Sequence, residues 1–279
     1  MTLRPAGGRG PLRFRDSYQG SSFSELLDTS YPHVRPFAAV QAVAGAPQAA
    51  GEAKLSVPHG TTVLGLKFKG GVIVAGDRLA TEGYRVASRD IQKVFATDDF
   101  SLMAIAGAAG PAIEMAKLLR VELEHYEKIE GEPLEVEGKA NKLSQMIRQN
   151  LPAAMQGLVV VPIFAGYDKR RMLGRVWKYD VTGGRYEETE FETTGSGGLY
   201  AKESLKKSWR PDASMEDGMR FALQALMDAA DEDRGTGGVD TVRGIYPNIF
   251  VCDAAGIQET PAERVAELHR ELVAARQRR

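Results

Sequence analysis

The sequence predicts an α+β protein in which antiparallel sheets carry helices on their outer faces. Three observations lead to this prediction. Apolar, strand-length runs come in groups separated by short turns, as they do in hairpins. Pairs of longer segments with apolar residues at helical spacing follow these groups. No unit of about 20–50 residues repeats, so a repeat architecture is not expected. Grouped strands and grouped helices favour antiparallel sheets over alternating β-α-β units.

Residues 1–60 differ in composition from the rest of the chain. They hold six of the 13 prolines and much Gly, Ala and Ser, so they offer little periodic apolar surface to offset the entropy of ordering. The exception is residues 16–28, where Phe23, Leu26 and Leu27 have the spacing of a short amphipathic helix that could dock on a larger body. The simpler interpretation is a leader without fixed structure.

Residues 61–279 are expected to form the globular domain, which opens with strands and continues with two helices. Turn chemistry separates the strands at Gly70 and at Asp98. Pro111 suits the first turn of a helix, which then continues to Gly131. The strands are expected at residues 62–68, 72–75, 93–97 and 101–106, and the helices at 111–131 and 138–154.

The second half of the domain shows the same order of strands followed by helices. Residues 195–198, with the sequence Gly-Ser-Gly-Gly, are expected to form a tight loop between the two groups. The expected elements are strands at residues 158–167, 174–179 and 185–191, helices at 199–208 and 215–231, a strand at 249–253 and a helix at 261–277.

Composition narrows the classes of function. A formal net charge of -1 argues against a nucleic-acid or anionic-membrane partner. No run approaches the ~18 apolar residues of a membrane span. The Arg-bearing N-terminus is not followed by an apolar run of about 7–15 residues, so Ala42-Val43-Ala44 is not expected to be a signal-peptidase site. The only cysteine, Cys252, lies in a strand-like run and is expected to be buried rather than nucleophilic. A chain without an internal disulfide fits a reducing compartment, and we expect a cytoplasmic protein.

Common catalytic motifs are missing from the sequence. The four histidines are scattered, and neither His-Glu-x-x-His nor Cys-x-x-Cys occurs, so no metal site is expected. The patterns of Walker A loops, dinucleotide loops and Gly-x-Ser-x-Gly elbows are also missing, and we expect no cofactor. A Ser-His-Asp triad would need His59, in the expected leader, or His125, on a charged helix face.

A different constellation begins where the globular domain begins. Gly60-Thr61-Thr62 opens the domain, Asp77 follows a buried strand, Lys93 begins another strand, and Gly107 follows the next. Taken singly, these residues have ordinary structural explanations as a turn, a cap and a solvated strand edge. Together and in this order, they resemble the β subunits of proteasomes, specifically those of the actinobacterial branch.

The resemblance covers the whole of residues 61–279, and the leader ending in Gly60 resembles the propeptide of that branch. The segments that carry it are Gly-Thr-Thr-Val at 60–63, Ala-Gly-Asp-Arg at 75–78, Lys-Val at 93–94, Ile-Ala-Gly at 105–107, Val-Glu-Leu-Glu-His-Tyr-Glu-Lys at 121–128, Ala-Ala-Met-Gln-Gly at 153–157, Gly-Ser-Gly at 195–197, and Asp-Ala-Ala-Asp at 228–231 with Gly-Gly at 237–238. It implies a four-layer αββα sandwich, two antiparallel sheets flanked by helices, which is the fold of N-terminal-nucleophile hydrolases.

The resemblance also implies a threonine endopeptidase that degrades unfolded or tagged proteins. Residues 1–60 would be a propeptide that the chain removes itself by cutting between Gly60 and Thr61. A glycine before the cut lets the backbone approach the hydroxyl without a Cβ clash. While the bond is intact Thr61 has no basic amine, so the precursor should be inactive toward other substrates.

Reference pKa values explain why an N-terminal threonine suits this chemistry. An α-amine titrates near about 7.7–8.0, whereas a lysine titrates near about 10.4. The free amine of Thr61 would therefore be a near-neutral base for its own hydroxyl, the nucleophile. By resemblance, Lys93 would be an ammonium that lowers the pKa of this hydroxyl, and Asp77 would hold Lys93 in place. The base remains open between the Thr61 amine and a neutral Lys93.

The resemblance assigns further roles around Thr61. Gly107 would direct its backbone N–H at the oxyanion. Three side chains would hydrogen-bond around the Thr61 amine, namely those of Ser196, Asp233 and Thr236. The family commonly has Ser where this chain has Thr236, and Asp231 and Glu232 leave the register of the Asp233 assignment open.

The S1 pocket of the family maps onto five uncharged residues, which are Ala80, Ile91, Phe95, Ile105 and Ala109. Such a pocket favours apolar or aromatic P1 residues, with only about 1–3 kcal/mol of discrimination per methylene. We expect a chymotrypsin-like preference with broad tolerance.

The resemblance implies partners as well. They are heptameric β rings stacked in pairs between rings of α subunits, an ATPase ring, and substrates tagged with a prokaryotic ubiquitin-like protein. Two alternatives remain. One is another N-terminal-nucleophile hydrolase, such as the bacterial heat-shock peptidase or a small-molecule amidase. The other is an inactive ring scaffold, against which the joint presence of Thr61, Asp77, Lys93 and Ser196 argues.

Overall fold

The structure, a computed structural model, describes residues 60–82 and 85–278. Apart from Gly60, the expected leader lies outside the described residues, and so does the helix expected at residues 16–28. The division of the chain into leader and domain therefore stays a prediction.

Five strands from both ends of the domain form the first sheet, in the order β10-β1-β2-β11-β12. All neighbouring pairs in this sheet are antiparallel. The continuous apolar run predicted to be a buried strand is β2, in which every residue is buried. The strands are β1 (Thr62–Phe68), β2 (Gly71–Gly76), β10 (Phe191–Gly195), β11 (Asn248–Asp253) and β12 (Gly256–Glu259).

The second sheet has five strands in sequential order, β5-β6-β7-β8-β9. Its pairs are antiparallel too, as expected for strands that are joined mostly by short turns. The strands are β5 (Val94–Asp98), β6 (Ser101–Ala104), β7 (Ile163–Asp168), β8 (Leu173–Tyr179) and β9 (Arg185–Glu188).

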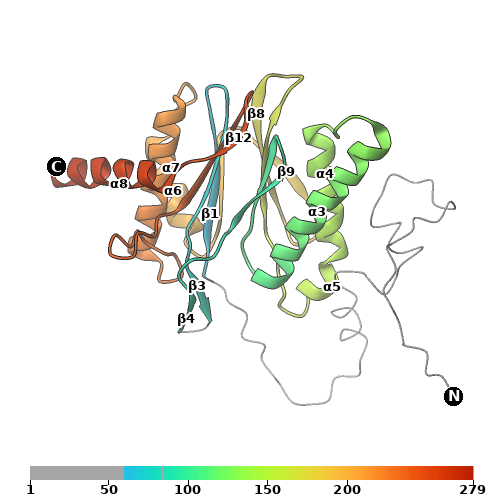
Figure 1. Ribbon diagram of the computed structural model, residues 1–279. Helices are drawn as coiled ribbons and strands as arrows, with labels where there is room; N and C mark the ends of the chain where they lie inside the picture. The colour runs from blue at the N-terminus through green and yellow to red at the C-terminus, as the bar shows by residue number, and fades with distance from the viewer. Residues whose placement is uncertain (1–59, 83–84, 279) are drawn as a thin grey trace, which may run out of the picture.

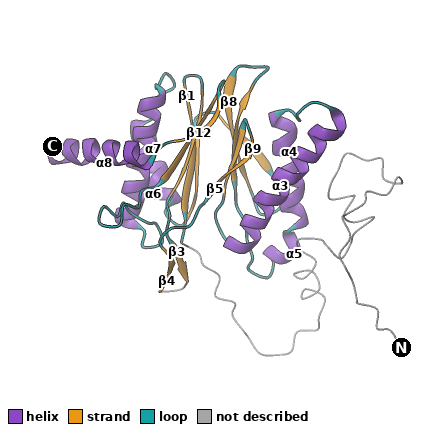
Figure 2. Ribbon diagram, viewed as in Figure 1, coloured by secondary structure: helices purple, strands orange, loops and turns teal. Residues whose placement is uncertain are grey.

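Helices cover the outer face of each sheet, so that the two sheets face one another inside the molecule (Figures 1 and 2). The helices α6 and α7 lie on the first sheet, and α3 and α4 lie on the second. The helices are α3 (Ala109–Glu130), α4 (Val136–Gln149), α5 (Leu151–Ala154), α6 (Gly198–Ser208), α7 (Met215–Glu232) and α8 (Ala262–Gln277).

Three apolar clusters fill the spaces between these four layers. Leu66 and Leu223 belong to the cluster between the first sheet and its helices. Leu102 belongs to the cluster between the two sheets. Leu119 and Phe164 belong to the cluster between the second sheet and its helices. The αββα sandwich expected from the resemblance, and the α+β class expected from the pattern, are confirmed.

Some predicted boundaries are wrong. Residues 185–191 are not one strand, because the chain leaves the second sheet after β9 and joins the first as β10. This stretch contains no Gly or Pro that would mark the change of sheet. The helix expected at residues 138–154 is interrupted at Asn150, which the proline of the following turn helps to explain. The strand expected from residue 158 begins at Ile163.

Three short strands, in two places, were not predicted at all. One is β12; the other two, β3 (Ala80–Glu82) and β4 (Arg85–Ser88), form a separate two-stranded sheet. All three are short and partly polar, so they carry no apolar alternation that would reveal a strand. No helix within the described ranges is long and apolar enough to cross a bilayer.

Candidate active site

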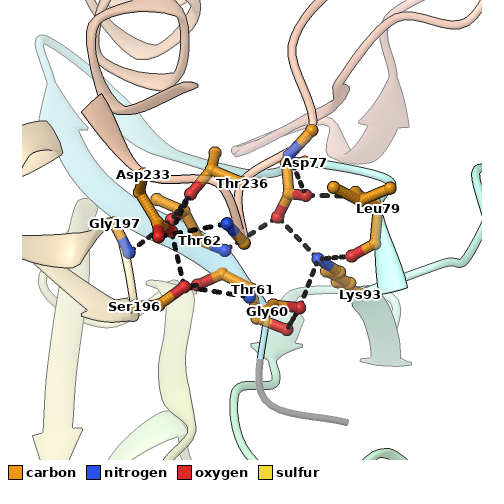
Figure 3. Close-up of polar contacts among 12 residues, drawn as sticks. Gly60, Thr61, Thr62, Asp77, Leu79, Lys93, Ser196, Gly197, Asp233 and Thr236 are labelled. Carbon is orange, nitrogen blue, oxygen red and sulfur yellow. Dashed lines mark hydrogen bonds and ion pairs between the residues drawn. The ribbon is translucent and has the colours of Figure 1, made fainter. Parts of the chain in front are cut away.

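Thr61 lies immediately before β1, at one end of the first sheet, and only 7% of its surface is exposed. Its peptide bond to Gly60 is intact in the described chain. The Thr61 Oγ1 donates a hydrogen bond of 2.6 Å to the carbonyl oxygen of Gly60. The Thr61 N–H donates to the Ser196 Oγ over 3.3 Å. Figure 3 shows these contacts around the Gly60–Thr61 bond, which the resemblance predicts to be cut.

Gly60 occupies a space that admits no side chain. A Cβ at this position would meet the Thr81 Oγ1 at 2.5 Å and the carbonyl oxygen of Gly235 at 2.6 Å. Both distances are far below van der Waals contact, and one neighbour is backbone. The residue type at position 60 is therefore fixed by packing against two other segments, as well as by any role in cleavage.

Asp77 and Lys93 form a buried ion pair beside Thr61, with the Lys93 Nζ 2.6 Å from the Asp77 Oδ1. Asp77 follows β2 of the first sheet and Lys93 precedes β5 of the second, so the pair links the two sheets. Lys93 also donates to the carbonyl oxygen of Leu79 at 2.6 Å and to that of Gly60 at 3.4 Å. All three donors of the ammonium thus have acceptors, one of which is the carbonyl next to Thr61.

Backbone donors hold the carboxylate of Asp77 from the other side. The N–H of Thr62 donates to Oδ1 at 2.7 Å, and the N–H groups of Leu79 and Gly237 donate to Oδ2 at 3.0 and 2.7 Å. Asp77 is fully buried, so these bonds replace the water that a carboxylate would otherwise need.

The electrostatics of Lys93 combine two opposing effects. Burial lowers the pKa of the Lys93 ammonium below its ordinary value, and the negative charges of Asp77 and Asp233 offset part of that effect. Its surface is only 3% exposed. The result is a desolvated cation whose hydrogen bonds fix its position.

Ser196 and Thr236 both donate to one carboxylate oxygen of Asp233. The Ser196 Oγ lies 2.5 Å from the Asp233 Oδ2, and the Thr236 Oγ1 lies 2.6 Å from it. Asp233 is the C-cap residue of α7, and the end of this helix sets the position of the Asp233 carboxylate. Burial alone would raise the pKa of Asp233, but these hydrogen bonds and one from the Gly235 N–H outweigh burial and lower it.

Of the three side chains expected around the Thr61 nitrogen, only Ser196 contacts it directly. Asp233 accepts a hydrogen bond from Ser196. The hydroxyl of Thr236 forms a hydrogen bond of 2.6 Å with that of Thr62. Thr236 therefore belongs to the same cluster of polar residues, but it is linked to the Thr61 nitrogen through Asp233 and Ser196.

Gly107 lies in the same cavity as Thr61, in a backbone conformation with φ 106°. A Cβ here would come within 2.1 Å of the Val159 carbonyl oxygen, so packing as well as conformation requires glycine. Within residues 60–82 and 85–278, no acceptor takes the backbone N–H of Gly107.

The cavity beside Thr61 is lined largely by uncharged residues. Four of the five expected S1 residues line it, and the fifth, Phe95, packs against the apolar cluster beneath α3 to which Ile105 also belongs. The lining consists of Gly60, Thr61, Ala80, Ile91, Gln92, Lys93, Ile105, Ala106, Gly107, Ala109 and Ala112.

Sequence reasoning missed Thr62, the carbonyl of Leu79 and the N–H of Gly237. The last two are backbone groups, which leave no signal in the residue type. Thr62 could have been noticed as a hydroxyl adjacent to Thr61, but its buried, inward direction in β1 depends on the register with β10.

Known proteins resemble this chain along most of its length. Residues 57–244 match a family described as Proteasome subunit. This chain belongs to the proteasome subunit family. Among its proteasome relatives, one named "Proteasome subunit beta" from Acidimicrobium ferrooxidans is 55% identical over 216 residues, which is 77% of this chain and 79% of the relative. A protein of the same name from Nocardia farcinica is 48% identical over 274 residues, or 95% of each chain.

A third proteasome relative, "Proteasome subunit beta" from Rhodococcus erythropolis, is 50% identical over 261 residues, covering 92% of this chain and 88% of its own. Within the proteasome family the chain is therefore of the β type, and its resemblance to actinobacterial β subunits is confirmed.

Cys252 is fully buried in β11, and burial raises the pKa of its thiol to about 12. It lies in a strand, as expected. No cluster of potential metal ligands occurs among the described residues.

Proposed function

We propose that this β subunit is a catalytic one, an N-terminal threonine endopeptidase of the proteasome core that is made as a zymogen and cuts its own Gly60–Thr61 bond. The observation that carries the proposal is the position of the Thr61 hydroxyl against the Gly60 carbonyl. The Lys93 ammonium lies on the same carbonyl oxygen. A nucleophile and a cation thus meet at the bond to be cut.

In the proposed cleavage, the Thr61 Oγ1 bonds to the carbonyl carbon of Gly60 as the hydroxyl proton leaves. The carbonyl oxygen becomes an oxyanion beside Lys93. The C–N bond then breaks as the Thr61 nitrogen takes up the proton that the hydroxyl lost, which leaves an ester between Gly60 and the Thr61 oxygen. Water hydrolyses the ester, releasing residues 1–60 with a C-terminal carboxylate and a chain that begins with a free amine.

After cleavage, the new amine of Thr61 is the better candidate for the base. It needs a pKa shift of only about one unit to titrate near neutrality, whereas a lysine needs more than about three, or roughly 4–5 kcal/mol. Burial lowers the pKa of Lys93, but the negative charges of Asp77 and Asp233 raise it. Three acceptors also surround Lys93, which suits an ammonium better than a neutral amine.

Substrate chemistry would follow the same geometry. The Thr61 oxygen attacks the peptide carbonyl while the amine accepts its proton. The N–H of Gly107, in the same cavity and without an acceptor in the described chain, is the proposed donor to the oxyanion. One such donor is typically worth about 10²–10³ in rate. Ser196 and Asp233 would orient the amine.

The uncharged lining of the cavity supports a preference for apolar or aromatic P1 residues. Ala80, Ile91, Ile105 and Ala109 would form its walls. Phe95 packs against the same apolar cluster as Ile105, and it stays a proposed residue of the pocket.

We further propose that the chain assembles into paired heptameric β rings between rings of α subunits, in the cytoplasm. An ATPase ring would deliver unfolded proteins, including those tagged with a prokaryotic ubiquitin-like protein. The names of the relatives, each a proteasome subunit beta, support assembly with other subunits.

Replacing Thr61 by alanine tests the function. Thr61→Ala should keep residues 1–60 attached, by intact mass, and should abolish hydrolysis of a fluorogenic peptide with an aromatic P1 residue. Thr97→Ala is a control, because Thr97 is a buried threonine of β5 whose hydroxyl bonds, among the described residues, only to Ser101. Normal processing and turnover by Thr61→Ala would refute the assignment and favour another nucleophile. A wild-type chain that is never processed would favour the inactive scaffold.

A further inference from the structure

Thr62 is fully buried, and its hydroxyl lies at the centre of the hydrogen bonds around Thr61 (Figure 3). Its Oγ1 accepts from the Gly197 N–H at 3.1 Å and pairs with the Thr236 Oγ1 at 2.6 Å. Its backbone N–H donates to Asp77 at 2.7 Å. One residue therefore contacts both the Asp77 side and the Asp233 side of the site.

Chemistry fixes the direction of each hydrogen bond in this chain of contacts. A carboxylate only accepts, so the hydroxyl proton of Thr236 points to Asp233. Thr236 must then accept the proton of Thr62, which in turn accepts from the N–H of Gly197. Each hydrogen bond therefore has one possible direction: Gly197 donates to Thr62, Thr62 donates to Thr236, and Thr236 donates to Asp233.

The consequence reaches the nitrogen of Thr61 through Ser196. The Ser196 hydroxyl has two acceptors in reach, Asp233 at 2.5 Å and the Thr61 carbonyl at 3.3 Å. A second donor, Thr236, holds the same Asp233 oxygen in place, so the Ser196 proton points to Asp233. A lone pair of Ser196 is then available to the Thr61 nitrogen at 3.3 Å.

The hydroxyl of Thr62 lies in a closely packed space. A Cβ on Gly197 would lie 2.4 Å from both the Thr62 and the Thr236 oxygens, so the backbone packs directly on them. If the Thr62 hydroxyl were removed, the Gly197 N–H and the Thr236 oxygen would lose a partner in a closed space.

We infer that Thr62 is a positioning residue for the catalytic amine: its hydroxyl orders Thr236, Asp233 and Ser196 so that Ser196 presents an acceptor to the nitrogen of Thr61. This inference rests on the proposed function, in which that nitrogen becomes the base.

The test compares Thr62→Val, which keeps the shape and removes the hydroxyl, with Thr62→Ser, which keeps the hydroxyl. The full chains are produced with their partner subunits, and peptide hydrolysis is normalised by intact mass to chains that begin at Thr61. Thr62→Val should lower kcat on the order of ten-fold, the effect of one buried hydrogen bond, with KM unchanged. Thr62→Ser should restore kcat to within about two-fold of wild type.

The pH profile separates positioning from a loss of stability. A hydrogen bond to Ser196 and the charge of Asp233 favour the protonated amine, while the cation Lys93 opposes it equally in all variants. The acid limb of kcat/KM should therefore move to lower pH in Thr62→Val. In the matched control Thr97→Val, a buried hydroxyl is lost in β5 and the limb should not move.

Two results would overturn the inference. One is a Thr62→Val enzyme with the kcat and pH profile of wild type. The other is a loss of activity that Thr62→Ser does not restore or that Thr97→Val shares. In both cases an inactive Thr61→Ala chain would leave the proposed function standing, whereas an active one would remove it.

Discussion

The ion pair of Lys93 and Asp77 is buried, and such pairs usually cannot lose one partner without a large cost. Removing one partner of a buried pair typically costs about 3–5 kcal/mol, because the other charge is left without compensation. Here Asp77 keeps hydrogen bonds from three backbone N–H groups even when Lys93 is gone. The carboxylate remains satisfied, so activity and stability can be separated at this pair.

Lys93→Ala should therefore fold but hydrolyse peptides about 10³-fold more slowly, within the range of about 10²–10⁴ for positioned acid–base groups. The loss of unfolding free energy should stay below about 3 kcal/mol. Both are measured on the full chain, by peptide hydrolysis per folded site and by chemical denaturation.

The control for this variant is a second buried lysine, Lys139 of α4, which pairs with Asp98 away from the site. Lys139→Ala should lose stability and keep its rate per folded site. A wild-type rate for Lys93→Ala would remove Lys93 from the mechanism.

Gly60 offers a second prediction, about maturation. Gly60→Ala places a Cβ within 2.6 Å of a backbone oxygen of Gly235, so the scissile bond must shift away from the hydroxyl of Thr61. Release of residues 1–60 should slow at least about ten-fold, since a small misplacement of reacting atoms can cost about 10²-fold. Intact mass against time measures it.

Gly110→Ala is the matched control, because nothing lies within 4 Å of a Cβ at that position in α3. It should mature at the wild-type rate. If Gly60→Ala also matured normally, the packing around Gly60 would not be a requirement for cleavage.

At the scale of elements, the helices and strands that carry long apolar patterns could be predicted from the sequence. The continuous run in β2 and the helical spacing in α3 and α7 correspond to buried strands and helices because burial imposes those periods. The change of sheet between β9 and β10 escaped prediction because it depends on tertiary packing. The hairpin of β3 and β4 escaped because its residues are mostly exposed.

The site shows the same division between side chains and backbone. Thr61, Asp77 and Lys93 could be proposed from their types, order and family resemblance, and the fold brings them together. The carbonyl of Leu79 and the N–H of Gly237 could not, because any residue carries those groups.

Because Asp77 belongs to one sheet and Lys93 to the other, the packing between the sheets should affect catalysis. Leu102 of β6 is fully buried between the sheets. Leu102→Ala should lower the unfolding free energy by about 2–5 kcal/mol and also lower kcat several-fold, since the sheets can shift around the cavity.

Leu143 of α4 is an equally buried leucine, but it packs on the outer face of the second sheet. Leu143→Ala should lose similar stability, measured by chemical denaturation, with little change in kcat. Equal losses of kcat in the two variants would contradict a specific role for the packing between the sheets.

At the scale of the whole molecule, one described chain supplies every polar group of the proposed mechanism. Thr61, Asp77, Lys93, Ser196 and Asp233 come from distant parts of the sequence and meet in one network of polar contacts (Figure 3). The proposed mechanism therefore needs no catalytic residue from another subunit.

The central claim is that one residue carries both the nucleophile and the base. A peptide epoxyketone tests it, because the stable adduct of this reagent needs a hydroxyl and an amine on adjacent carbons. Assembled particles of the wild-type chain should bind it covalently, and mass spectrometry should map the adduct to Thr61 as the first residue. An adduct on another residue, or none on active mature particles, would contradict the account.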